Sequence, residues 1–179
     1  MVDVDDTFCM DPADLEKKIT AHSHAVLLVH MSGAPGAVDK IAAMCRAHRL
    51  PLIEDCAQAN GSSFRGKPAG SFGDMAIFSF QLNKNITAGE GGLLVCDDEA
   101  LYRRAWACHD VGYPRTAEGR LDPTNPSLQL WRQGSRCSEL LAAVVYTQLK
   151  KLDTITGAMR KAKYALRRKL EGLPGLTFR

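Results

Sequence analysis

The chain has 179 residues, of which 45% are hydrophobic and 24% are charged, and its formal net charge is +3. This composition is typical of a globular protein with one full core and excludes a disordered chain. The small charge gives no support for a nucleic-acid-binding protein, no apolar run could span a bilayer, and the acidic N-terminus is unlike a signal peptide, so we expect a cytoplasmic protein that binds neither nucleic acid nor membrane.

The first third of the chain is predicted to alternate helices and strands. The predicted elements are, in order, a helix over 11–19, a strand over 25–29, a helix over 37–48 and a strand over 51–54. Asp11 and Pro12 are a typical helix start. The segment 25–29 is a short, fully apolar run, and 51–54 is a short run that ends in Glu54. A strand, a helix and a second strand of these lengths predict a β-α-β unit, and therefore a largely parallel sheet covered on both faces.

The rest of the chain is predicted to add two strands, a long loop and three helices. The predicted elements are a glycine-bearing loop over 56–74, a buried strand over 75–80, a second buried, apolar strand over 93–96, a helix over 98–106, a loop over 110–136, and helices over 138–152 and 158–170. The last helix carries the basic residues Arg160, Lys161, Lys163, Arg167, Arg168 and Lys169. Because no aromatic or glycine-rich segment accompanies them, we interpret them as a solvated helix face rather than a nucleic-acid site.

The six cysteines are scattered along the chain, and no two of them form a C-x-x-C pair. Most lie in apolar contexts. We therefore expect buried free thiols, and neither disulfides nor a metal site.

A polar loop between the two later strands holds a lysine, Lys84, that has little reason to be there for stability. An ammonium group near buried strands must be solvated or paired, and a lysine in such surroundings loses its proton easily and attacks carbonyl groups. We interpret Lys84 as a Schiff-base lysine.

Other polar residues are predicted at the same edge of the sheet. Asp55 follows one strand, Ala57 and Gln58 come shortly after it, and Ser79 ends the next strand. Ligand sites of parallel sheets lie at the carboxyl ends of strands. A pyridoxal phosphate enzyme needs a lysine for the aldehyde, an acid for the ring nitrogen and hydroxyls for the phosphate. Each residue alone has a simpler interpretation: Asp55 as a turn cap, Gln58 and Lys84 as surface residues, Ser79 as a strand-end hydroxyl.

Three segments resemble the DegT/DnrJ/EryC1/StrS family of sugar aminotransferases. They are IEDCAQANG over 53–61, GSFGD over 70–74 and FSFQLNKNITAGEGG over 78–92. The resemblance covers nearly the whole chain and is weakest over 111–132. It implies an α/β fold of type I. Residues 1–136 would form the pyridoxal phosphate-binding large domain, which has three layers (α/β/α) and a mostly parallel sheet and is incomplete in this chain. Residues 137–179 would form helices that lead into a small C-terminal α/β domain.

The same resemblance implies the roles of individual residues. Lys84 would hold pyridoxal 5'-phosphate as a Schiff base and move the proton, Asp55 would pair with the ring nitrogen, Ala57 would pack on the ring, Gln58 would lie near the ring hydroxyl and Ser79 would bind phosphate. Related enzymes that dehydrate sugars carry histidine at the position of Lys84, so transamination is favoured. The segments 80–85 and 30–33 are most similar to the branch that aminates an eight-carbon keto-sugar acid.

The sequence departs from the family pattern in two ways. The family begins well before Met1, so we expect a fragment with an uncovered sheet edge and apolar face, reduced cofactor affinity and weak activity. Many members have asparagine at the position of Gly134, two residues before Arg136, where it reaches the phosphate of the other subunit.

The sequence therefore predicts an enzyme that transfers an amino group from glutamate or glutamine to a keto-sugar and forms a homodimer at full length. Two alternatives stay open: a non-catalytic remnant that binds a full-length partner through the dimer surface, and an α/β binding domain in which Lys84 is only structural.

Overall fold

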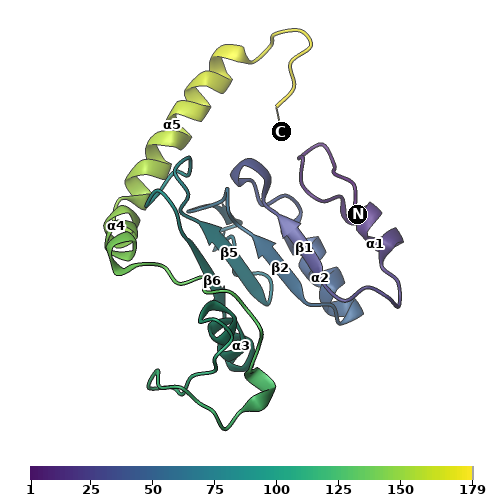
Figure 1. The fold of residues 1–179 in the computed structure, drawn as a ribbon. Helices are drawn as coiled ribbons and strands as arrows, with labels where there is room; N and C mark the ends of the chain where they lie inside the picture. The colour runs from purple at the N-terminus through teal and green to yellow at the C-terminus, as the bar shows by residue number, and fades with distance from the viewer. Residues whose placement is uncertain (179) are drawn as a thin grey trace.

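The computed structural model of the chain describes residues 1–178 (Figure 1). Its elements are α1 (Pro12–Lys18), β1 (Val26–Val29), the 3-10 turn η1 (Met31–Gly33), α2 (Val38–His48), β2 (Leu52–Asp55), β3 (Ser63–Phe64), β4 (Lys67–Pro68), β5 (Met75–Ser79), β6 (Gly92–Cys96), α3 (Glu99–His109), η2 (Pro126–Leu128), α4 (Glu139–Leu149) and α5 (Leu152–Leu170). Every predicted helix and strand is present. The differences are the β3–β4 hairpin, which was not predicted, and the start of α5, which lies six residues before the predicted one.

Side-chain caps explain where three of the helices begin. Asp11 Oδ1 accepts a hydrogen bond from the backbone N–H of Ala13 at the start of α1, over 2.8 Å. Asp98 caps α3 and Ser138 caps α4 in the same way, each accepting from the N–H three residues later. Each cap satisfies a backbone donor that has no partner inside its helix.

The central sheet has four strands in the order β1-β2-β5-β6 (Figure 1). The pairs β1–β2 and β2–β5 are parallel, and β6 runs antiparallel to β5. In the register, Asp55 is opposite Val29 of β1 and Ile77 of β5. The sheet is therefore mostly parallel, as predicted, and the carboxyl ends of β1, β2 and β5 meet at one edge.

One face of the sheet is covered and the other is open. The covered face forms the core with α1 and α2, through Leu15, Val26, Leu28, Val38, Ile41, Ala42, Cys45 and Leu52. On the opposite face Leu27 is 53% exposed, Ile77 36% and Leu94 41%. The expectation of an uncovered apolar face is confirmed. The prediction that the strand over 93–96 is buried was wrong, because β6 is the edge strand and its apolar side chains face solvent.

All six cysteines are free thiols, and Cys9, Cys45 and Cys56 are buried. Burial, together with the negative charges of Glu54 and Asp55, raises the pKa of the Cys56 thiol to about 12. Cys137 is exposed. The prediction of free thiols is confirmed for all six, and that of burial for three.

Because the thiolate is the reactive form, the cysteines are expected to differ in reactivity. Brief treatment of the folded chain with iodoacetamide at neutral pH should alkylate Cys137 and leave Cys56 unmodified, as measured by peptide mass mapping. A sample unfolded in urea is the control and should be modified at both. Equal modification of both in the folded chain would contradict the buried position of Cys56.

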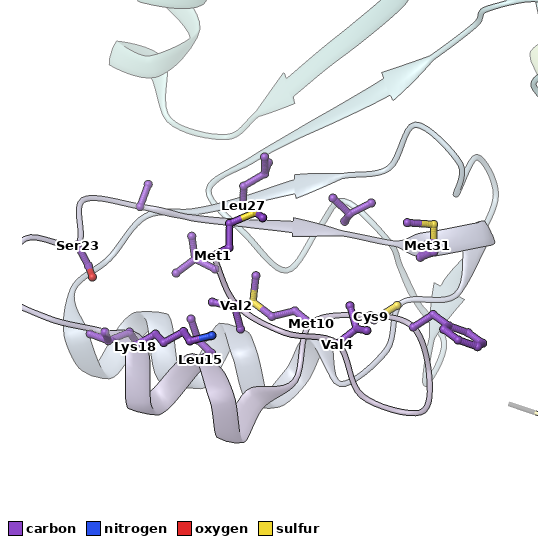
Figure 2. A pocket seen from close by; sticks show the side chains of 15 residues that line it. Met1, Val2, Val4, Cys9, Met10, Leu15, Lys18, Ser23, Leu27 and Met31 are labelled. Carbon is purple, nitrogen blue, oxygen red and sulfur yellow. The ribbon is translucent and has the colours of Figure 1, made fainter.

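An apolar groove lies between the N-terminal segment, α1 and β1. It has a volume of about 580 Å³, and its lining includes Val2, Met10, Leu15, Leu27 and Met31 (Figure 2). Lys18 is its one charged side chain, so the groove offers no group of catalytic residues. Within residues 1–178, none of the helices has the length and hydropathy that a membrane span requires.

Candidate active site

The loops that follow β1, β2 and β5 are joined by side-chain hydrogen bonds at the carboxyl edge of the sheet. Gln58 Oε1 accepts from the backbone N–H of Ser32 over 2.7 Å, and Ser62 Oγ donates to the carbonyl of Gly33 over 2.6 Å. Asn60 Nδ2 donates to the carbonyl of Ser79 over 2.9 Å. The three loops therefore form one fixed polar surface, as expected at the carboxyl ends of parallel strands.

The loop that carries Lys84 is fixed at its base and at its centre. The carbonyl of Phe80 accepts a hydrogen bond from the N–H of Ala88 over 3.0 Å, and the N–H of Phe80 donates to the carbonyl of Gly91 over 2.9 Å. Ile86 is 1% exposed and anchors the loop in the protein. The N–H of Lys84 donates to the carbonyl of Gln81 over 2.9 Å. Lys84 is thus held on a rigid turn, although it lies several residues after the end of β5 in the chain.

Lys84 lines a pocket of about 620 Å³ together with Ala57 and Gln58. The Lys84 side chain is half-buried. Within the described part of the chain, no carboxylate forms an ion pair with it. Among the described residues, Lys84 therefore lines the pocket without an ion-pair partner.

Asp55 and Ser79 lie at the ends of β2 and β5 rather than in the lining of that pocket. Since Asp55 is opposite Ile77, the alternation of side chains places Asp55 and Ser79 on the same face of the sheet. Asp55 Oδ1 accepts from the N–H of Ala57 over 2.9 Å, and Ser79 Oγ accepts from the N–H of Gln81 over 3.3 Å. The structure therefore groups Ala57, Gln58 and Lys84 in one pocket, with Asp55 and Ser79 at adjacent strand ends.

A buried histidine–glutamate pair, which was not predicted from the sequence, lies on the opposite face of the same strands. His30 Nε2 is 2.8 Å from Glu54 Oε2, and both residues are fully buried. Glu54 also accepts from the backbone N–H groups of Gly70, Phe72 and Gly73, over 2.6 to 2.8 Å. The pair thus fixes the loop before β5 to β1 and β2. A signal was present in the sequence, namely a carboxylate in an apolar strand immediately before Asp55.

Glycine at position 73 lets this loop approach the sheet. A Cβ atom there would lie 2.5 Å from the carbonyl oxygen of Leu52, a distance that real contacts do not reach. Only glycine allows the backbone to pass so close to a strand and donate to Glu54.

His30 and Glu54, together with Cys56, have potential metal-ligand atoms within 4.8 Å of one another. Both carboxylate oxygens of Glu54 already accept two hydrogen bonds each. The carboxylate is fully used by protein donors, so we assign the cluster a structural role.

The pKa of Glu54 is lowered although burial acts in the opposite direction. Burial raises the pKa, but the hydrogen bonds from His30 and from the N–H groups of Gly73, Gly70 and Phe72 lower it more. The net result is a pKa below the ordinary value of 4.5.

A carboxylate with a lowered pKa makes stability depend on pH. Its contribution is present above pH 4.5, the ordinary value, and is lost as the pH falls through the lower value of the folded chain. We expect the urea midpoint of the chain to fall on acidification below that pH, and the fall to be smaller in Glu54→Gln, which has no carboxylate there. Parallel pH profiles of the two proteins would show that Glu54 is not the responsible group.

Arg136, two residues after Gly134, forms an ion pair within the chain. Its Nη1 is 3.3 Å from Oδ1 of the buried Asp110, and Arg115 also pairs with Asp110. Arg136 is 62% exposed at its side chain. These pairs fix the segment after α3.

Comparison with known proteins gives a family match over the whole chain. Residues 1–179 match the DegT/DnrJ/EryC1/StrS aminotransferase family. An L-glutamine:2-deoxy-scyllo-inosose aminotransferase of Streptoalloteichus tenebrarius is 40% identical over 170 residues, which are 90% of this chain and 39% of that protein. An L-glutamine:scyllo-inosose aminotransferase of Streptomyces griseus is 40% identical over 164 residues, 86% of this chain and 37% of that protein. The chain spans about two fifths of the length of these curated relatives.

Solved structures agree on the fold. The aminotransferase TlmJ of Streptoalloteichus hindustanus superposes with a TM-score of 0.88 at 27% identity, covering 99% of this chain and 47% of that chain. A GDP-4-keto-6-deoxy-D-mannose-3-dehydratase of E coli with bound hydrated pyridoxal phosphate gives a TM-score of 0.85 at 28% identity, with 97% and 47% coverage. The α/β fold predicted from the sequence is confirmed.

Proposed function

The chain belongs to the DegT/DnrJ/EryC1/StrS aminotransferase family, and from this we propose that it is the cofactor-holding part of an enzyme that transfers an amino group to a ketone of a sugar or sugar-like ring. The proposed cofactor is pyridoxal 5'-phosphate, and the proposed product is an amino sugar or amino cyclitol.

One observation carries the proposal: an amine without an ion-pair partner, Lys84, is held on a rigid turn in a pocket beside Ala57 and Gln58. Asp55 and Ser79 lie on one face at adjacent strand ends. A carboxylate, a hydroxyl and a lysine at one edge of a sheet are the groups that pyridoxal phosphate needs, so the residues present fit this cofactor.

When bound, pyridoxal phosphate supplies an electrophilic aldehyde and an electron-withdrawing ring. In our proposal, Lys84 Nζ holds the cofactor covalently and afterwards moves a proton between donor and acceptor carbons. Asp55 would use the oxygen that does not bind Ala57 to hold a proton on the ring nitrogen. Ala57 would pack against the ring, Gln58 would lie near its hydroxyl, and Ser79 would donate to the phosphate.

The names of the relatives support L-glutamine as the amino donor, because the two inosose aminotransferases are named for that donor. They also support a ring ketone as the acceptor. They do not single out the eight-carbon keto-sugar acid suggested by the resemblance, so the acceptor we propose is the broader class.

The proposal is tested by the first half of the reaction alone, which needs no sugar. The purified chain is incubated with pyridoxal phosphate and L-glutamine, and pyridoxamine phosphate is measured by chromatography. We expect its formation at a rate above that of cofactor and glutamine without protein. No formation by a chain that is folded by circular dichroism would overturn the catalytic proposal and favour the non-catalytic remnant.

We also propose slow turnover for this chain alone, because it spans only about two fifths of the length of its curated relatives. The division after residue 136 and the homodimer of the whole enzyme stay predictions; light scattering on the full-length protein would test the dimer.

A further inference from the structure

Helix α5 borders the pocket that contains Lys84. Thr156, Met159, Arg160, Lys163 and Tyr164 supply one side of the lining, at the three- and four-residue spacing of a single helix face. The opposite side comes from the loops after β1, β2 and β5. The basic helix that the sequence analysis interpreted as a solvated face therefore has two of its cations, Arg160 and Lys163, beside Lys84.

Close contacts hold α5 in this position. Arg160 Nη2 donates to the carbonyl of Gly61 over 3.0 Å. Thr156 is 9% exposed and lies so close to Gly61 that a Cβ atom there would be 2.9 Å from Thr156 Cγ2. The helix is thus packed directly on the loop that carries Ala57 and Gln58, and the exposed Arg160 side chain is hydrogen-bonded to the same loop.

The charged side chains that line this pocket are all positive. Its lining contains Lys84, Arg160 and Lys163, and the other lining residues are uncharged. Arg160 and Lys163 form no ion pair with a carboxylate in residues 1–178. Cations gathered in a hollow without balancing acids attract an anionic ligand.

We propose that Arg160 and Lys163 form an anion-binding subsite that holds a phosphate or carboxylate group of a substrate whose reacting carbon lies at Lys84. This proposal rests on the proposed function, since that function places the reaction at Lys84. The planar guanidinium of Arg160 suits two oxygens of one group, and the ammonium of Lys163 adds a point charge one turn away. Two sources share this chemistry: a phosphate carried by the sugar substrate and the carboxylate of the amino donor.

The test measures binding rather than turnover, and it is done without cofactor, so that it can succeed or fail independently of the chemistry at Lys84. Inorganic pyrophosphate and L-glutamine are titrated separately into the chain by calorimetry at low salt. The variants are Arg160→Gln and Lys163→Gln, and the matched control is Lys161→Gln, which removes the same charge from the same helix outside the pocket lining.

We expect at least one probe to bind. Arg160→Gln and Lys163→Gln should each raise the Kd of that probe about tenfold, and Lys161→Gln should change it less than twofold. Binding of pyrophosphate assigns the subsite to a phosphate, and binding of L-glutamine alone assigns it to the donor carboxylate. Absence of binding for both probes, or an equal loss in Lys161→Gln, would overturn the proposal. Lys163 makes no hydrogen bond within the described residues, so a loss in Lys163→Gln is not a folding effect.

Discussion

Glu54→Ala is expected to lower the free energy of unfolding by about 3–5 kcal/mol, which is the cost of removing one partner of a buried charged pair. The substitution would leave His30 Nε2 and the N–H groups of Gly70, Phe72 and Gly73 without their acceptor inside the protein. A domain of this size is stable by about 5–15 kcal/mol in total. Urea unfolding followed by circular dichroism measures the loss, and much of the variant should be unfolded at low urea.

Two further variants make this expectation specific. Glu54→Gln keeps one accepting oxygen and two of the four hydrogen bonds, so it should be less destabilising than Glu54→Ala. Glu16→Ala changes an exposed glutamate on α1 and should shift stability by no more than about 0.5 kcal/mol. A loss in Glu54→Ala as small as that in Glu16→Ala would show that the buried pair does not hold the loop.

Lys84→Ala is expected to remove the chemistry that we propose while the fold stays intact. Lys84 is half-buried and forms no ion pair in residues 1–178, so its removal breaks no structural contact of that kind. Proton transfer by a positioned side chain contributes about 10²–10⁴-fold to rate. The rate of pyridoxamine phosphate formation from L-glutamine should fall by about 10²-fold or more. The circular dichroism spectrum should be unchanged.

Lys161→Ala is the control for this expectation, since it removes a lysine from α5 outside the pocket. It should form pyridoxamine phosphate at the rate of the original chain. If Lys84→Ala is as active as Lys161→Ala, Lys84 does not carry the chemistry that we propose for it.

Local patterns were sufficient to predict most of the fold. Short apolar runs without charges predicted β1 and β5, and a short run that ends in Glu54 predicted β2. The Asp11–Pro12 pair predicted the start of α1 through a cap that the structure contains. The grouping of Ala57, Gln58 and Lys84 also follows from local order, because loops after neighbouring parallel strands meet at one edge.

The features that could not be predicted depend on distant contacts. Burial of β6 was wrongly expected because an apolar run does not tell whether another layer covers it. The pairing of His30 with Glu54 joins residues 24 positions apart. Arg160 reaches a loop 99 positions away along the chain. A helical pattern alone could therefore not distinguish the two pocket-lining cations of α5 from the solvated ones.

The most direct test of the central claim is to trap the bond between Lys84 and the cofactor. The chain is incubated with less than one equivalent of pyridoxal phosphate, reduced with borohydride and mapped by peptide mass spectrometry. We predict a pyridoxyl group mainly on the peptide that contains Lys84. Labelling spread evenly over Lys84 and exposed lysines such as Lys161, in a folded chain, would contradict it.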